Sequence, residues 1–457
     1  MPRRLASSTA IEQVLELPDH MKYGKPPEPS YLKDYQIKLT RLPTGLTVAS
    51  VDTLRDVSRI AMAFKCGTRY ETPEYFGATQ RIRGLLGLGS DDFPATEVGP
   101  LQGEIGSTFS ATYTRENLLV SLSCPRNYSA DGIELLGELS RPSIRNWAVT
   151  DHLGDVDSEI EASSAPQNRL MEVIHRAAFG TSGLGNPLVW PANTIKRHPA
   201  SSIRRYADMH MVSGKGVLVG VGVDHQSLLG YAADHLKLIE SPGMPSTKSP
   251  FRGGEEREVE TLHHTYGAMV VEGNSLKNVK NAGAELILGT LLCGAPGVRP
   301  ELRGRVGPSL LLKALKKAAP NAQAGIVNIN YSDTGLFGVQ FSSEPQHTEQ
   351  VGRICFETLS NVASQISDED FEVAKKATVL YLLALEERDE NLLDNMAQQV
   401  LANGEYVNPH QSLQSVNSLT KQDVQKIANR FIAAGSKMAY GVLGNLETTP
   451  YLEDLSK

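Results

Sequence analysis

The chain of 457 residues is long enough for about three domains of ordinary size, or for two large ones. Its composition, 40% hydrophobic and 21% charged, is typical of a globular protein with a large core. Forty-five basic and fifty-two acidic residues give a net charge of −7, which excludes the positive excess of nucleic-acid-binding proteins. No apolar run approaches the roughly 18 residues of a membrane-spanning helix. We therefore expect any membrane association to occur only through partner subunits.

The cysteines and the N-terminal residues indicate the compartment. Four cysteines lie far apart and form no CxxC motif, which favours reduced thiols inside a cell. They are Cys66, Cys124, Cys293 and Cys355. The first residues, MPRRLASST, are typical of the start of an organelle-targeting segment, because they contain arginine and hydroxyl groups and precede the first acid, Glu12.

In the first half of the chain, periodicity predicts strands and helices in alternation. The run FSATYTRENLLVSLSC predicts a β-hairpin around Tyr113. Helical spacing follows over residues 131–147, where Pro142 indicates a break, and again over residues 166–179. The segment GVLVGVGVDH predicts a short buried strand around Gly220.

The second half repeats this order. VNINYSDTGLFGVQFSS predicts a hairpin around Tyr331, and MAYGVLGNLE predicts a strand around Gly441. Helical spacing occurs over residues 282–292, 308–316 and 368–385. The two hairpins are 218 positions apart (331 − 113) and the two strands 221 (441 − 220). Two landmarks at nearly one offset indicate an internal duplication.

Proline and glycine divide the chain into parts. Residues 241–258 contain three prolines and three glycines with little periodicity, which predicts an interdomain linker. We therefore expect an N-terminal extension over 1–35, one domain over 36–240 and a second over 259–457. The fold class is α+β, in which each domain packs helices against one face of a mostly antiparallel sheet.

Common catalytic motifs do not occur in the sequence. No two of the eleven histidines are four positions apart, which excludes HExxH and HxxEH zinc motifs. GxxxxGK[ST], a strand–GxGxxG–helix unit and GxSxG do not occur either. His175 lies in a predicted amphipathic helix, where an ordinary packed or surface histidine is the favoured interpretation. We expect no catalytic residue, no bound metal and no cofactor.

One glycine-rich segment, residues 294–307, remains a candidate binding loop. Glycine lets the backbone approach a ligand or an extended peptide closely. The candidate substrate-binding residues are Gly294, Gly297, Gly304 and Gly307. The alternative is a surface connection between two helices.

Several motifs resemble the M16 metallopeptidases, the inverzincin family that includes mitochondrial processing peptidase. A strand over Ser58–Cys66 continues into GTRYE and then GAT at residues 77–79, which resembles the family's strand–G[ST]RxE–helix entry. LPTGLTVA at residues 42–49 resembles its opening strand. The resemblance covers about residues 36–455. It implies two homologous domains, joined by a linker into a bowl or clamshell.

Three further segments resemble the core protein 2 branch of this family, which belongs to the mitochondrial cytochrome bc1 complex. They are FRGGEERE at 251–258, YSDTGLFG at 331–338 and the ending GNLETTPYL at 444–452.

The resemblance also implies a degenerate catalytic site. Active M16 members carry H-x-x-E-H, in which two histidines bind zinc and the glutamate activates water. Here the same positions hold Gln80, Arg83 and Gly84. An amide is a poor zinc ligand, glycine has no side chain, and the arginine repels a divalent cation. The family's downstream glutamate ligand falls near Glu159 or Glu161, and one carboxylate cannot replace three ligands.

The resemblance therefore implies a non-catalytic core subunit of ubiquinol–cytochrome c reductase, peripheral on the matrix side of the mitochondrial inner membrane. Its implied partners are core protein 1 or a processing-peptidase β-type subunit, with the cytochrome b, cytochrome c1 and Rieske subunits. The alternative is the zinc-free α-type subunit of processing peptidase, in which a glycine-rich loop engages the substrate.

Overall fold

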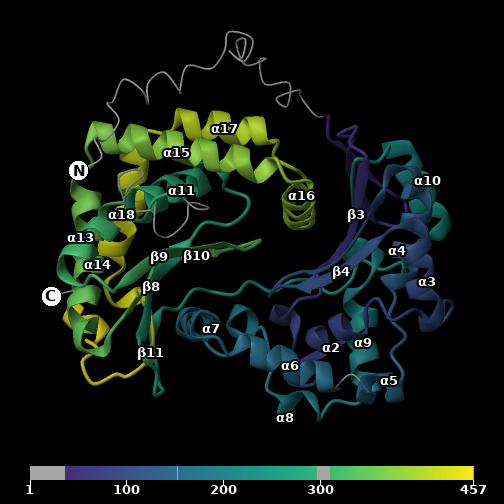
Figure 1. The fold of residues 1–457 in the computed structure, drawn as a ribbon, viewed down its shortest axis with the longest axis horizontal. Helices are drawn as coiled ribbons and strands as arrows, with labels where there is room; N and C mark the ends of the chain where they lie inside the picture. The colour runs from purple at the N-terminus through teal and green to yellow at the C-terminus, as the bar shows by residue number, and fades with distance from the viewer. Residues whose placement is uncertain (1–35, 152, 296–308, 456–457) are drawn as a thin grey trace, which may run out of the picture. The chain divides into compact units, whose positions relative to one another are not determined.

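Two β-sheets of matching strand order organise the protein (Figure 1). The computed structural model describes residues 36–151, 153–295 and 309–455. The first sheet has the order β1-β2-β6-β3-β5-β4 and the second β7-β11-β8-β10-β9. The strands of the first sheet are β1 (Lys38–Arg41), β2 (Thr47–Val51), β3 (Val57–Phe64), β4 (Thr108–Tyr113), β5 (Leu118–Pro125) and β6 (Gly216–Val221). Those of the second are β7 (Gly254–Val259), β8 (Thr265–Gly273), β9 (Gln323–Asn330), β10 (Gly335–Ser343) and β11 (Ala439–Gly444).

Strand pairing confirms the predicted hairpins and the duplication. β4 and β5 pair antiparallel with Tyr113 opposite Leu118, and β9 and β10 pair in the same way with Asn330 opposite Gly335. Each sheet also contains one parallel pair, β2 with β6 and β7 with β11. Without β1, which has no counterpart, the two sheets have the same order and the same directions.

Helices surround both sheets. Those before the second sheet are α2 (Ala78–Leu85), α3 (Ala95–Ile105), α4 (Ser129–Leu139), α5 (Asn146–Asp151), α6 (Leu153–Ser163), α7 (Pro166–Phe179), α8 (Ala192–Ile195), α9 (Ala200–His210) and α10 (His225–His235). Those within the second half are α11 (Val279–Cys293), α13 (Leu310–Ala318), α14 (Thr348–Ser364), α15 (Asp368–Glu386), α16 (Asp389–Asn403), α17 (Pro409–Ser418), α18 (Lys421–Ala434) and α19 (Leu452–Leu455). None of the helices in the described ranges is long and apolar enough to cross a bilayer.

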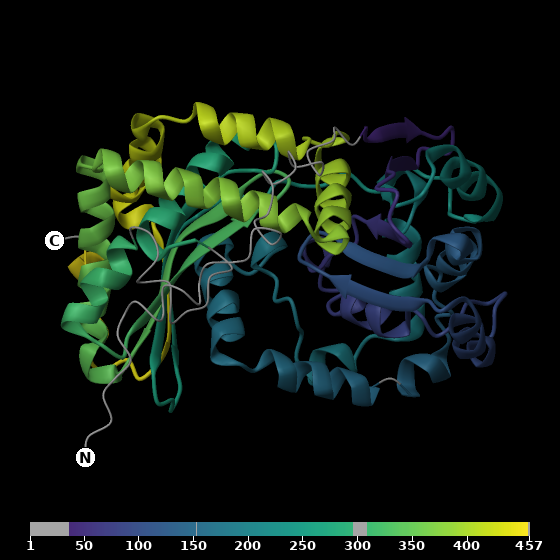
Figure 2. The same cartoon turned by 45° about the horizontal axis from the view of Figure 1, so that its top comes forward.

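Each half lends one helix to the sheet of the other half. α7 packs on β11, β8 and β7, whereas α16 packs on β3 and β6 (Figures 1 and 2). In the second sheet, Met269 faces the core formed with the helices of its own half, and the neighbouring Ala268 and Val270 face α7. We expected helices on one face of each sheet. The helices of the same half do cover one face, but the exchanged helix covers the other, so alternate residues of the central strands are buried on both faces.

The two exchanged helices bury equivalent residues. Leu170 of α7 and Leu393 of α16 are both buried, 223 positions apart (393 − 170). The same offset relates four further buried pairs. They are Val173 and Met396, Ile174 and Ala397, Ala177 and Val400, and Ala178 and Leu401. The duplication therefore extends to the helix exchange.

Two boundaries differ from the predicted ones. Residues 240–253 contain no helix or strand, but Gly254–Val259, at the end of the expected linker, forms β7. β7 is an edge strand with charged side chains on both faces, so its sequence lacks the alternation of a half-buried strand. The helix predicted over 131–147 ends at Leu139 and a second begins at Asn146, on either side of Pro142.

A buried ionic cluster joins the two halves where their hairpin turns meet. Arg69, which follows β3, donates Nη1 to Asp333 Oδ1 at 2.7 Å and also pairs with Glu116. Glu116 lies in the β4–β5 turn and Asp333 in the β9–β10 turn. Arg69 also donates to the carbonyl of Thr247 at 2.9 Å, and Ser332 donates its amide to Glu116 at 2.9 Å. The linker and both hairpin turns therefore converge on one guanidinium group.

The charges of this cluster are shielded from water. The side chain of Arg69 is 3% exposed, that of Glu116 6% and that of Asp333 17%. Burial opposes the charge of Arg69, but hydrogen bonding to Asp333 and the nearby Glu116 raise the pKa of Arg69 overall. Burial acts to raise the pKa of Asp333. The hydrogen bond from Arg69 nevertheless holds the pKa of Asp333 below its usual value. Each charge is thus stabilised by the others.

We expect Arg69→Met to lower the free energy of unfolding by about 3–5 kcal/mol, because it leaves two carboxylates buried without their cation. Urea denaturation measures the change. The control is Arg353→Met, which removes an exposed pair with Glu349 on α14 and costs less than about 1 kcal/mol. Equal losses for both variants would contradict the role of the cluster.

We expect Met396→Ala to destabilise the first sheet, although Met396 lies in the second half of the chain. Met396 is fully buried on α16, and its truncation costs about 2–5 kcal/mol. Hydrogen exchange should become faster at amides of β3 and β6, which α16 covers. Lys376→Ala on the exposed side of α15 is the control and leaves exchange in these strands unchanged.

Candidate functional site

The M16 resemblance places the zinc motif on α2, and a buried carboxylate, Glu71, lies at the start of this helix. Gly77, with φ of 85°, precedes α2. The carboxylate of Glu71 accepts the amides of Gly77 at 3.0 Å and Thr79 at 2.8 Å, and the indole Nε1–H of Trp190 at 2.6 Å. Burial raises the pKa of Glu71 to about 7, although these three donors act in the opposite direction. Glu71 therefore anchors the first turn of α2.

Gln80 stands where the M16 resemblance implies the first zinc-binding histidine, and both ends of its amide are hydrogen-bonded. Its Nε2 donates to Glu159 Oε2 at 3.1 Å, and its Oε1 accepts the backbone amide of Trp190 at 3.0 Å. Tyr113 donates its hydroxyl to the other Glu159 oxygen at 3.0 Å. Gln80 is 1% exposed. The structure thus brings Gln80 and Glu159 together, whereas Glu161 is exposed at the other candidate position.

The other two motif positions offer no ligand. Arg83 is exposed and donates Nε to the carbonyl of Ala111 on β4 at 3.2 Å. A Cβ atom built on Gly84 meets no other atom within 4 Å, so the helix has room for a side chain that the sequence does not supply.

These side chains do not fit a zinc ion. Zinc sites in proteins use histidine nitrogen, thiolate or carboxylate ligands, usually three or four together. Here Glu159 is the carboxylate that meets residue 80, and its oxygens already accept bonds from Gln80 and Tyr113. Across the described ranges, no three His, Cys, Asp or Glu side chains are grouped closely enough to hold a metal ion. The site is a closed hydrogen-bond network.

A cavity of about 1170 Å³ lies beside this network. Phe76 and Trp190 line it and stack on each other with ring centroids 4.1 Å apart. Its charged groups are paired, for example Arg115 Nη2 with Glu172 Oε2 at 2.7 Å. Positive and negative groups on its walls therefore largely neutralise each other.

His175 lines the same cavity as a packed histidine, as the sequence favoured. Its Nε2 lies 2.7 Å from the hydroxyl of Tyr331 and its Nδ1 lies 2.6 Å from the carbonyl of Met171. Burial lowers the pKa of His175 well below its ordinary value. Both ring nitrogens are occupied, so His175 connects α7 to the second hairpin and is not available as a general base.

The glycine-rich loop is described only at its start. Gly294 follows α11 with φ of 81° and donates its amide to the carbonyl of Thr290 at 2.9 Å. The positive φ at this residue favours glycine, and α11 ends here. Gly297, Gly304 and Gly307 lie outside the described residues.

The sequence did not predict that Glu71, Tyr113 and Trp190 belong to the site. Glu71 was recognised only within GTRYE, and its capping role depends on two amides six and eight positions later. Tyr113 was identified as a hairpin landmark. Trp190 is one of two tryptophans in the chain, and this rarity is the one signal that could have singled it out.

We expect the combined changes Gln80→His, Arg83→Glu and Gly84→His to create a zinc site. Two imidazoles would then share a helix face beside Glu159, which already lies within hydrogen-bond distance of residue 80. Metal analysis after dialysis should find about one zinc ion per chain in the triple variant and none in the unmodified chain. Adding Glu159→Gln to the triple variant is the control and should weaken zinc retention. Stoichiometric zinc in the unmodified chain would contradict the conclusion that these donors do not fit the metal.

Profiles of one peptidase family match both halves of the chain. "Insulinase (Peptidase family M16)" matches residues 47–192, and "Peptidase M16 inactive domain" matches residues 199–378. The second profile begins before the second sheet and ends within α15.

Similar proteins span nearly the whole chain. Cytochrome b-c1 complex subunit 2 of Rattus norvegicus is 30% identical over 93% of this chain and 93% of its own length. The Homo sapiens protein of the same name is 30% identical, with 94% of each chain covered. A probable mitochondrial-processing peptidase subunit alpha-2 of Arabidopsis thaliana is 25% identical and covers 94% of this chain and 87% of its own.

A solved structure has the same fold. A chain of complex III2 from Candida albicans with Inz-5 bound superimposes with a TM-score of 0.78 at 16% identity, covering 92% of this chain and 99% of that one. At this identity the match concerns the fold alone. With the profiles and the relatives at 30% identity, it follows that the chain belongs to the M16 peptidase family.

Proposed function

We propose that this chain is a non-catalytic core subunit of ubiquinol–cytochrome c reductase, complex III, which contributes to the assembly and stability of the matrix-side part of the complex. The observation that carries the proposal is the Gln80–Glu159 hydrogen bond, because it joins a carboxylate to a neutral amide where the M16 resemblance implies two zinc ligands. The names of the relatives from Rattus norvegicus and Homo sapiens support the same assignment.

In this role the chain is peripheral on the matrix side of the mitochondrial inner membrane and associates with the membrane only through other subunits. Its proposed partners are core protein 1 or a processing-peptidase β-type subunit, and the cytochrome b, cytochrome c1 and Rieske subunits. The haems and the iron–sulfur cluster belong to those other subunits, so the contribution of this chain is mechanical.

A second candidate is the α-type, zinc-free subunit of mitochondrial processing peptidase, either alone with a catalytic partner or integrated in complex III. The observation in its favour is the relative from Arabidopsis thaliana. Its identity of 25% is lower than the 30% of the complex III relatives, so the core subunit remains the favoured function. Gly294, Gly297, Gly304 and Gly307 would be the substrate-binding residues in this case.

We expect the chain to migrate with cytochrome b and cytochrome c1 when mild detergent extracts of mitochondrial inner membranes are separated on native gels. Mass spectrometry of the gel bands measures this. A matrix protein of similar mass is the control and should remain in the soluble fraction. Recovery of the chain only in a soluble heterodimer with a peptidase β-type subunit would instead establish the second candidate.

A further inference from the structure

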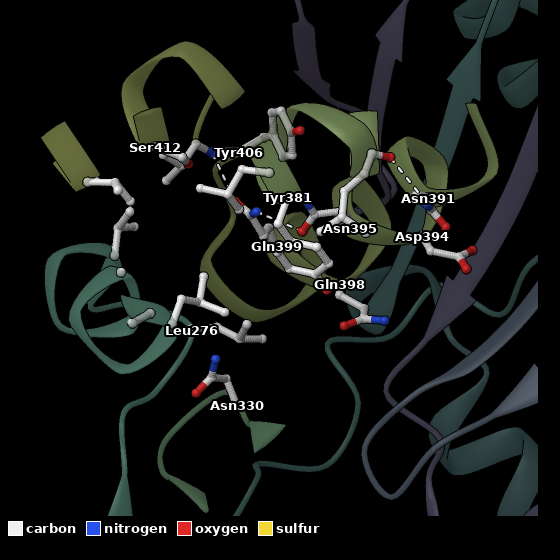
Figure 3. A pocket seen from close by; sticks show the side chains of 18 of the residues that line it. Leu276, Asn330, Tyr381, Asn391, Asp394, Asn395, Gln398, Gln399, Tyr406 and Ser412 are labelled. Carbon is white, nitrogen blue, oxygen red and sulfur yellow. Dashed lines mark hydrogen bonds between the residues drawn. The ribbon is translucent and has the colours of Figure 1, made fainter. Parts of the chain in front are cut away.

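The internal duplication produced two related cavities. α7 lines the cavity of about 1170 Å³ described above, and α16 lines a second one of about 490 Å³ (Figure 3). Residues of α7 on the wall of the first cavity correspond to residues of α16 on the wall of the second at one constant offset of 223 (391 − 168). The pairs include Asn168 and Asn391, Glu172 and Asn395, and His175 and Gln398. The two copies of one helix face have therefore become two chemically different walls.

The second cavity carries little charge. Asp394 is the one charged residue on its walls in the described part of the chain. Carboxamides of α16 and β9 supply most of its polar groups. They are Asn391, Asn395, Gln398 and Gln399 of α16 and Asn328 and Asn330 of β9. Apolar side chains of α11, α15 and α17, such as Leu286, Leu385 and Val416, also line the cavity. These walls suit a neutral ligand that has both an apolar surface and hydrogen-bonding groups.

Hydrogen bonds orient the carboxamides of α16 before any ligand arrives. Gln399 donates Nε2 to Asn395 Oδ1 at 2.8 Å and accepts the amide of Val407 at 3.0 Å (Figure 3). Asn391 donates to the carbonyl of Leu385 at 3.2 Å. Fixed side chains of this kind lose little conformational entropy when a ligand binds.

The two carboxamides of β9 have oxygens without a hydrogen-bond donor. Asn328 and Asn330 are two positions apart on the strand, so their side chains leave the same face of the sheet. The Oδ1 atoms of both are buried and accept no hydrogen bond from any residue in the described ranges. A buried acceptor without a donor is destabilising. A ligand that brings N–H groups to this wall would remove the penalty.

Two tyrosines give the cavity flat surfaces. Tyr381 of α15 and Tyr406, which follows α16, both line it, and Figure 3 shows Tyr381 beside the carboxamides of α16. Aromatic rings stack on planar heterocycles. The lining therefore combines amide groups for the edge of a planar ligand with ring surfaces for its face.

We propose that this cavity binds an adenine nucleoside without phosphate groups. The exocyclic amino group of the base donates to the oxygens of Asn328 and Asn330, and a carboxamide nitrogen donates to a ring nitrogen, as Asn and Gln side chains pair with adenine in general. Tyr381 provides a stacking surface for the base. The carboxylate of Asp394 accepts the ribose hydroxyls, a role that acidic side chains have in other nucleoside sites. This inference goes beyond the core-subunit function and does not depend on it.

The same walls disfavour related ligands. A phosphate group finds no cation on the described walls and is repelled by Asp394. A sugar alone has no planar ring to stack on the tyrosines. The volume of about 490 Å³ lies within the range of about 300–1,000 Å³ of small-molecule sites.

The test titrates the full-length chain with adenosine by isothermal titration calorimetry. One adenosine should bind per chain with a dissociation constant below about 100 µM, the affinity expected for a ligand of this size. Inosine, in which an oxygen replaces the amino group, should bind about tenfold more weakly, because it presents an acceptor to the oxygens of Asn328 and Asn330. Adenosine monophosphate should also bind about tenfold more weakly or worse.

Three results would overturn the proposal. The first is the absence of saturable adenosine binding up to about 1 mM. The second is equal affinity for adenosine and for either inosine or the monophosphate. The third is binding of ribose alone as tightly as adenosine, which would identify a sugar site.

A double variant on β9 locates the site. Asn328→Leu combined with Asn330→Leu removes two oxygens that have no donor in the free protein. The variant should therefore melt at the same temperature as the unmodified chain or higher, yet bind adenosine about tenfold more weakly. The control is Asn168→Leu in the first cavity, which should leave adenosine binding unchanged. Full adenosine affinity of the double variant, or a lower melting temperature of its free form, would contradict the role of the two oxygens. The comparison of adenosine with inosine tests the unmodified chain independently of any variant.

Discussion

The exchange of α7 and α16 between the halves is the constraint on which the rest of the structure depends. The central strands of both sheets bury alternate residues on both faces, and the helices of one half cover only one face. The second face of each sheet is covered by an apolar helix of the other half. Neither half can therefore bury its sheet alone, and hydrophobic burial makes the duplicated chain a single folding unit. The Arg69 cluster adds directional bonds at the point where the hairpin turns meet.

The exchanged helices also connect the core to the two cavities. One face of each helix is buried on a sheet and the adjacent face lines a cavity. The buried residues stayed apolar in both copies, because packing tolerates little change of volume or polarity. The cavity-facing residues were free to diverge, and they became charged and internally paired in one copy and carboxamide-rich in the other.

At the positions where the M16 resemblance implies a zinc site, α2 contributes to a closed hydrogen-bond network. Glu71 still anchors α2, and Glu159 still points at the side chain of residue 80. The partners of that carboxylate are the amide of Gln80 and the hydroxyl of Tyr113. A carboxylate withdrawn from water must be hydrogen-bonded or paired, and these neutral donors meet that need without a cation.

The order of strands and helices and the duplication could be predicted from the sequence, because they follow from local periodicity and a repeated spacing. The absence of a zinc site follows from the identity of Gln80, Arg83 and Gly84 and stays a prediction. Several features of the site could not be predicted, because each joins residues far apart in the chain. They are the choice of Glu159 over Glu161, the roles of Glu71 and Trp190, and the pairing of Arg69 with Asp333. The helix exchange was also hidden, since an apolar helix face shows that the helix is buried but not which sheet covers it. Local patterns encode what each segment becomes, whereas the tertiary structure decides which buried faces and charges meet, because those contacts depend on distances that no local pattern records.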